Sequence, residues 1–99
     1  MQKTKMKILF ISEYFYPKGR ENKERKVYKL AKALLEKKVE VHILTSYYKA
    51  WKVKEDIDGI NVWRLIEPID FEKSTEDFTA YLQNVFNFDM IVSLIEGEK

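Results

Sequence analysis

The residues best suited to chemistry begin at the last residue of an expected strand, residues 7–12. They offer a hydroxyl, a carboxylate, a phenol, two cations and a glycine: Ser12, Glu13, Tyr14, Lys18, Gly19 and Arg20. In open parallel sheets, ligands usually bind at the loop that follows such a strand. We therefore expect these residues to form a ligand site, with the cations holding an anion beside a helix start. An ordinary solvated turn is the alternative. Glu13 could act as a base, but no second catalytic group is identifiable, so no catalytic residue is predicted.

The chain holds one histidine and no cysteine. The lack of cysteine excludes disulfides, zinc–cysteine sites and thiol nucleophiles. His42 stands between Val41 and Ile43 in an apolar run, and one histidine without cysteine partners is not a metal motif. We expect His42 to be structural, and we predict neither a metal nor a cofactor.

Basic and aromatic side chains suggest further contacts. One face of the helix expected over residues 23–38 is basic, and aromatic residues gather around the expected loops. The basic face could touch nucleic acid or an anionic membrane surface, or could simply be solvated. The net charge of +2 is too small to imply nucleic acid, so we expect no such partner. The aromatic residues could line a sugar or nucleobase pocket, mark an interface or pack in the core. The basic residues are Arg25, Lys26, Lys29 and Lys32, and the aromatic residues are Tyr14, Phe15, Tyr16, Tyr47, Tyr48, Trp51 and Trp63.

The elements that must position these residues alternate between strand and helix. Apolar runs predict strands at residues 7–12, 39–45, 60–66 and 88–95. Helical spacing predicts helices over residues 23–38 and 74–87, with Asn22 and Ser74 as N-caps. Residues 52–57 either pair back across Asp58-Gly59 as a hairpin or belong to the crossover.

This alternation predicts an α/β fold, a three-layer Rossmann-like open parallel sheet of about four strands in the order 3-2-1-4 with helices on its faces. Residues 1–99 are expected to form one small domain. No apolar stretch approaches the roughly 18 residues that a membrane span needs, and no signal peptide is recognisable, so the cytoplasm is the expected location. The Lys- and Glu-rich composition is also typical of thermophilic proteins.

In the order 3-2-1-4 the last strand lies at an exposed edge of the sheet. Exposed apolar edges invite pairing, so we expect this strand to mediate homodimer formation or to bind a partner protein. The apolar residues concerned are Phe88, Met90, Val92 and Leu94.

Taken together, these segments resemble the start of the N-terminal domain of nucleotide-sugar glycosyltransferases with the two-domain GT-B architecture, of the retaining family-4 type. The resemblance covers nearly the whole chain. It is carried by KILFIS with the following Tyr16-Pro17, by ERKVYKLAKAL, VEVHILT and DGINVWRL, and by FDMI where such enzymes begin a strand. It implies half of a GT-B N-terminal domain and, as ligand, a nucleotide-sugar or a sugar acceptor.

Departures from the family pattern bear on activity. Anchored on Glu24, residues 21–23 read Glu-Asn-Lys where the family has Gly-Gly-x, whose glycines let the backbone approach a diphosphate. Val92 and Leu94 stand where the family often carries histidines, and the C-terminal domain that holds most of the nucleotide-sugar site is missing. We expect a partial or vestigial acceptor-side domain that is inactive alone. The alternatives are a non-catalytic or self-associating interaction module and a weak nucleotide or nucleic-acid binder.

Overall fold

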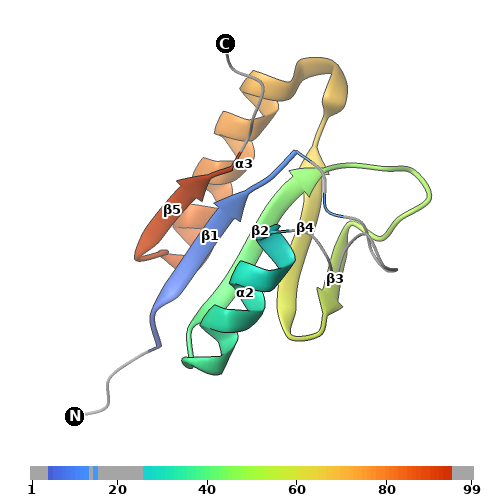
Figure 1. Ribbon diagram of the computed structural model, residues 1–99. Helices are drawn as coiled ribbons and strands as arrows, with labels where there is room; N and C mark the ends of the chain where they lie inside the picture. The colour runs from blue at the N-terminus through green and yellow to red at the C-terminus, as the bar shows by residue number, and fades with distance from the viewer. Residues whose placement is uncertain (1–4, 14, 16–25, 95–99) are drawn as a thin grey trace.

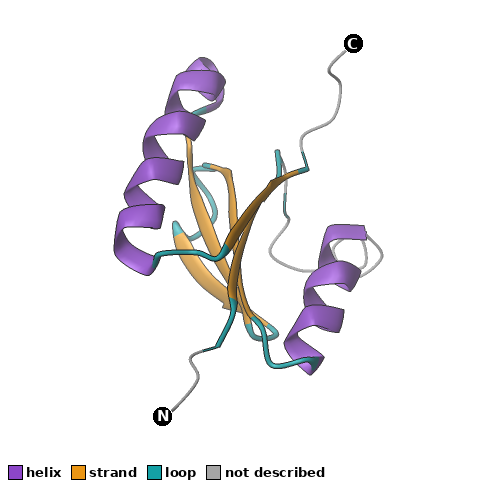
Figure 2. Ribbon diagram, turned by 90° about the vertical axis from the view of Figure 1, so that its left-hand side faces the viewer, coloured by secondary structure: helices purple, strands orange, loops and turns teal. Residues whose placement is uncertain are grey.

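A computed structural model describes residues 5–13, 15 and 26–94 (Figure 1). The elements in chain order are β1 (Lys7–Ile11), α2 (Lys26–Glu36), β2 (Glu40–Ser46), β3 (Lys54–Ile57), β4 (Ile60–Ile66), the 3₁₀ turn η1 (Pro68–Asp70), α3 (Phe71–Phe86) and β5 (Met90–Ser93). The sheet lies between two helices, with α2 on one face and α3 on the other (Figure 2). Within the described residues, no helix has the length and apolar character needed to cross a membrane.

The sheet has five strands in the order β3-β4-β2-β1-β5. β1 lies parallel to β2 and to β5, and β2 lies parallel to β4. β3 is antiparallel to β4 at one edge, so the sheet is mixed and mostly parallel. This arrangement is compatible with a Rossmann-like fold. The prediction of about four strands in the order 3-2-1-4 was wrong in count and at this edge, because β3 adds an outer strand beyond β4.

The extra strand exists because Asp58 and Gly59 form a tight turn. Both have positive φ angles, 54° and 94°, as a two-residue type I′ hairpin turn requires. The Gly59 N–H donates to the Asp56 carboxylate at 2.9 Å, which closes the turn. The hairpin, one of the two alternatives for residues 52–57, is thereby confirmed.

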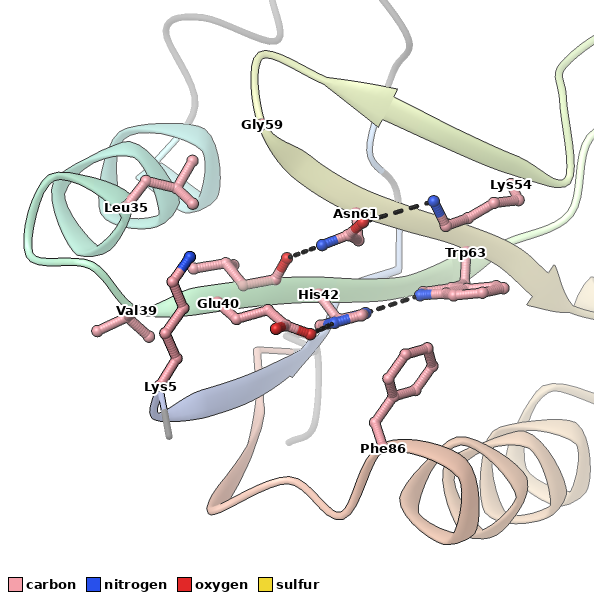
Figure 3. A pocket seen from close by; sticks show the side chains of 11 residues that line it. Lys5, Leu35, Val39, Glu40, His42, Lys54, Gly59, Asn61, Trp63 and Phe86 are labelled. Carbon is pink, nitrogen blue, oxygen red and sulfur yellow. Dashed lines mark hydrogen bonds and ion pairs between the residues drawn. The ribbon is translucent and has the colours of Figure 1, made fainter. Parts of the chain in front are cut away.

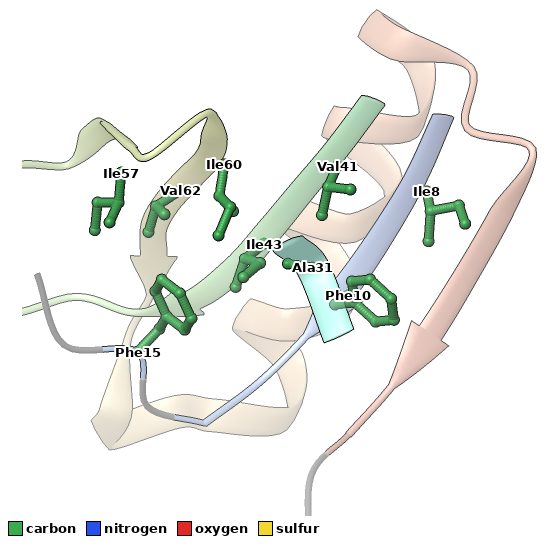
Figure 4. Packing of buried hydrophobic residues seen from close by; sticks show 9 residues of the cluster. All are labelled: Ile8, Phe10, Phe15, Ala31, Val41, Ile43, Ile57, Ile60 and Val62. Carbon is green, nitrogen blue, oxygen red and sulfur yellow. The ribbon is translucent and has the colours of Figure 1, made fainter. Parts of the chain in front are cut away.

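Apolar residues of the central strands contribute to two separate hydrophobic cores, one on each face of the sheet. β1 shows the division, because Ile8 and Phe10 face α2 whereas Leu9 and Ile11 face α3. Both faces are covered, which explains why β1 and β2 read as continuous apolar runs. The buried residues of the α2-side core are Ile8, Phe10, Phe15, Ala31, Val41, Ile43, Ile57, Ile60 and Val62 (Figure 4).

Helix α3 begins earlier than predicted. Ser74 was expected to cap this helix, but α3 starts at Phe71, directly after η1. Pro68 stands in the first turn of η1, where a missing N–H and a fixed φ suit the start of a helical segment. The Ser74 hydroxyl instead accepts a hydrogen bond from the Glu67 N–H at 2.9 Å and ties the helix to the end of β4. The predicted end at Asn87 is confirmed by its left-handed conformation, φ 58°.

The end of α2 leads to a first prediction. Lys38 has a φ of 68°, its N–H donates to the Leu35 carbonyl at 3.0 Å, and the Val39 N–H donates to the Leu34 carbonyl at 3.1 Å. This is a Schellman motif with lysine at the position that favours glycine. Lys38→Gly is expected to raise the free energy of unfolding by about 1 kcal/mol, because glycine adopts this conformation without strain. Urea unfolding measures the change. The control Lys37→Gly, one residue earlier, should destabilise instead, and a gain in both variants would contradict the assignment.

Candidate functional site

The carboxyl ends of the parallel strands meet at one edge of the sheet, where Ser12 and Glu13 follow β1. The Ser12 N–H donates to the Leu44 carbonyl at 3.0 Å, and the Thr45 hydroxyl donates to the Glu13 carbonyl at 3.2 Å. On the other side of β1, the Leu94 N–H donates to the Ile11 carbonyl at 2.7 Å. The chain leaving β1 is thus held between β2 and β5.

This position is a topological switch point of the sheet. The chain passes from β1 through α2 to β2 on one side, and from β4 through α3 to β5 on the other. Crossovers that diverge in this way leave a crevice at the carboxyl ends of the strands, where ligands of open α/β sheets bind. Ser12 is buried and Glu13 is half-buried there. Of the other expected ligand residues, Tyr14, Lys18, Gly19 and Arg20 lie outside the described residues.

The expected interface residues of the last strand have different surroundings. Phe88 is 5% exposed and belongs to the α3-side core, so it offers no surface to a partner, contrary to expectation. Val92 and Leu94 pack partly against the α2-side core. Met90 is 50% exposed and Ile91 is 40% exposed, so these two form the apolar surface of the edge. Ile91 was not among the apolar residues singled out for this strand, and its exposure follows from the helices packing mainly over β2 and β4.

The basic face of α2 is partly engaged by the hairpin. The Lys32 ammonium donates to the Asp58 carbonyl at 3.0 Å, and the Tyr28 hydroxyl donates to the Asp58 carboxylate at 2.6 Å. This hydrogen bond raises the pKa of Tyr28 above its ordinary value. Lys26 and Lys29 are exposed. Lys32 therefore ties the helix to the sheet, which leaves fewer cations for an outside partner.

A pocket of about 500 Å³ opens at the other end of the parallel strands from Ser12 and Glu13, near the amino ends of β2 and β4 (Figure 3). Its polar and aromatic lining comes from three strands, from the chain before β1 and from Phe86 at the end of α3. The main contributors are Lys5, Glu40, His42, Lys54, Asn61 and Trp63. Sequence reasoning did not find this pocket, because parallel pairing brings together residues that are far apart along the chain.

His42 lies in the wall of this pocket with both ring nitrogens occupied. Its Nδ1 is 3.0 Å from the Trp63 indole nitrogen, and its Nε2 is 2.7 Å from the Glu40 carboxylate. An indole N–H only donates, so Nδ1 accepts and Nε2 carries the proton that is donated to Glu40. The ring also packs against Phe86, with centroids 4.4 Å apart. His42 therefore takes the structural role expected of it, and the pocket offers binding groups rather than a free base.

Burial of His42 leads to a pH prediction. Burial lowers the pKa of the imidazole, helped by the charges of Lys54 and Lys7 and opposed by Glu40. The unfolded chain then takes up the proton first as the pH falls through about 6.5, so stability is lost on acidification. We expect the free energy of unfolding to fall between neutral pH and mildly acidic pH, by at most ~1.4 kcal/mol per pH unit. Urea unfolding at several pH values measures this slope. The same slope in His42→Gln would assign it to other groups.

The chain was compared with known proteins in three ways. No family model, no curated protein and no solved structure matches it. The fold and the site therefore define a class only: an α/β protein with a mostly parallel five-stranded sheet and a polar switch point at the carboxyl end of β1.

Proposed function

We propose that this chain is an acceptor-side domain of the GT-B glycosyltransferase type, which binds a nucleotide-sugar or a sugar acceptor and does not transfer sugar on its own. The observation that carries the proposal is the placement of Ser12 and Glu13 at the switch point of the sheet, between β2 and β5. Ligands of parallel α/β sheets bind at this position.

The order of the elements supports the proposal. The described residues of the segments that carry the family resemblance fall mainly in β1, α2, β2 and β4 and around the start of β5. β1 stands in the sheet between β2 and β5, so Ser12 and Glu13 lie at the middle one of three adjacent strand ends. A ligand there would contact the ends of three adjacent strands.

The described side chains at this edge support the proposal of binding without catalysis. Ser12, Thr45 and Ser46 are buried at this edge, and the Thr45 hydroxyl is bonded to the Glu13 carbonyl. The single histidine of the chain, His42, is held by Glu40 and Trp63 at the pocket near the amino ends of the strands. General acid–base catalysis needs a positioned group that can exchange a proton. Among the described residues at this edge, Glu13 carries a titratable carboxylate, but no histidine accompanies it.

The test is a titration of ¹⁵N-labelled protein with UDP-glucose and with GDP-mannose, followed by amide spectra. Saturable shifts centred on Ser12, Glu13, Thr45 and Leu94 are expected, with no release of free sugar. Glu13→Gln should weaken the binding, whereas Glu72→Gln on the exposed side of α3 should not. Absence of shifts at millimolar concentrations of both ligands would overturn the proposal.

A second function, self-association, is favoured by the exposed edge strand. β5 pairs with β1 on one side and has no neighbouring strand on the other among the described residues, and it exposes Met90 and Ile91. Unpaired backbone groups beside apolar side chains allow β5 of a second copy to add to the sheet. Sedimentation equilibrium should show a dimer that Ile91→Lys abolishes. Val85→Lys, at an exposed apolar position on α3, should leave the dimer intact. A wild-type protein that stays monomeric at high concentration would exclude this function.

A further inference from the structure

Arg64 is a fully buried cation on β4, with 0% of its surface exposed. It follows Ile60 and Val62 at alternate positions, so its side chain lies on the α2 side of the sheet. Glu55 of β3 pairs with Val62 across the hairpin and therefore lies on the same side. Arginine is rarely buried completely unless its charge and its donors are satisfied.

One nitrogen of the guanidinium is fully used. Nη1 donates to the Lys52 carbonyl at 2.8 Å and to the Glu55 carboxylate at 2.9 Å. The Trp51 ring covers the group, with its centroid 5.3 Å from the Arg64 central carbon. These contacts hold the guanidinium in one orientation.

The other two nitrogens, Nε and Nη2, are buried without a hydrogen-bond acceptor among the residues that the structure describes. Nearly all buried polar atoms in proteins have a partner, because a desolvated donor without one is costly, and more so when it carries charge. The Glu55 carboxylate is already bonded to Nη1. The described residues therefore supply no acceptor for Nε and Nη2 of Arg64.

The chemistry of the unpartnered edge specifies the acceptor. Nε–H and one N–H of Nη2 point in parallel from the same edge of the planar group, which is the fork that holds a carboxylate or a phosphate through two hydrogen bonds. We propose that this edge of Arg64 is a binding site for an oxyanion, the carboxylate or phosphate group of a small ligand.

The surroundings favour an anion at this place. Arg64 is in register with Thr45 in the last part of β2, at the same edge of the sheet as Ser12 and Glu13. Ligands of parallel sheets bind at this edge. Residues 47–53, which include Trp51, also contain Lys49 and Lys52 and no acidic residue. The site is separate from the His42 pocket, and it does not depend on whether the chain binds a sugar nucleotide.

The test uses the wild-type protein and the NMR signal of the Arg64 Nε–H, assigned through the side chain. The probes are inorganic phosphate and sodium acetate, with sodium chloride at matched ionic strength as control. A saturable shift with phosphate or acetate, and a matching rise in melting temperature, are expected. The anion that gives the tighter binding identifies the ligand group as phosphate or carboxylate.

Two variants sharpen the result. Arg64→Lys keeps the charge but lacks the fork, so anion affinity should fall by about tenfold or more. Lys73→Gln, at an exposed lysine on α3, should bind as the wild type does. If Arg64→Lys does not fold, the wild-type signal still decides. An Arg64 Nε–H signal that shifts with neither phosphate nor acetate, or that shifts equally with chloride, would overturn the proposed site.

Discussion

Phe88→Ala is expected to lower the free energy of unfolding by about 3–4 kcal/mol, the range for removing a buried phenylalanine ring. Phe88 is 5% exposed, and its ring lies 5.0 Å from that of His42 and 5.6 Å from that of Phe86 between centroids. The alanine variant would leave a cavity between α3 and the sheet, at the point where the chain turns into β5. Urea unfolding followed by circular dichroism measures the loss.

Met90→Ala is the matched control, because Met90 lies two residues further along the same apolar segment but is 50% exposed. Its replacement should change stability by less than ~0.5 kcal/mol. Equal losses in the two variants would contradict the placement of Phe88 in the core. The pair also separates stability from self-association, since only Met90 faces outward where a second copy could bind.

Glu55→Ala is expected to destabilise the protein by about 2–3 kcal/mol, because it leaves the Arg64 charge buried without its carboxylate. The full cost of breaking a buried pair, ~3–5 kcal/mol, is not expected, since the Glu55 side chain is 20% exposed while that of Arg64 is 0% exposed. Urea unfolding of the variant measures the effect.

The exposed pair of Lys73 and Asp77 is the control. Its side chains are 70% and 62% exposed and lie 3.5 Å apart at i,i+4 spacing on α3. Asp77→Ala should therefore cost less than ~0.5 kcal/mol. Adding Arg64→Met to Glu55→Ala should recover part of the stability, because the unpaired charge is removed. A double variant no more stable than Glu55→Ala alone would show that the charge is not the source of the loss.

Local patterns in the sequence predicted the parallel strands well. The strand expected at residues 60–66 is β4 with the same bounds, because buried and half-buried residues alternate along it. β1 and β2 were found from their apolar runs. The position of Ser12 and Glu13 at the end of β1 follows from the same pattern, because the carboxyl end of a strand is a local feature.

At other places, local patterns left alternatives open or did not separate buried from exposed residues. β3 reads Lys-Glu-Asp-Ile, and only Ile57 of this strand is buried, so its pattern resembles a loop. Its pairing is decided by the Asp58-Gly59 turn and by β4 beside it. Phe88 and Met90 are both apolar and only two residues apart, yet one is buried and the other is half-exposed. Which of them is covered depends on where α3 packs.

By itself, the sequence determined the class of fold and the place of Ser12 and Glu13 at the carboxyl end of β1, since both follow from periodicity and chain order. Tertiary structure decided between hairpin and crossover for residues 52–57, and it alone decided the hydrogen bonding of His42 with Glu40 and Trp63 and the burial of Arg64 beside Glu55. The physical reason is that burial and hydrogen bonding of a polar side chain depend on partners from other strands. Arg64 reads in the sequence as an ordinary strand cation, and only the strands around it reveal two donors in need of an acceptor.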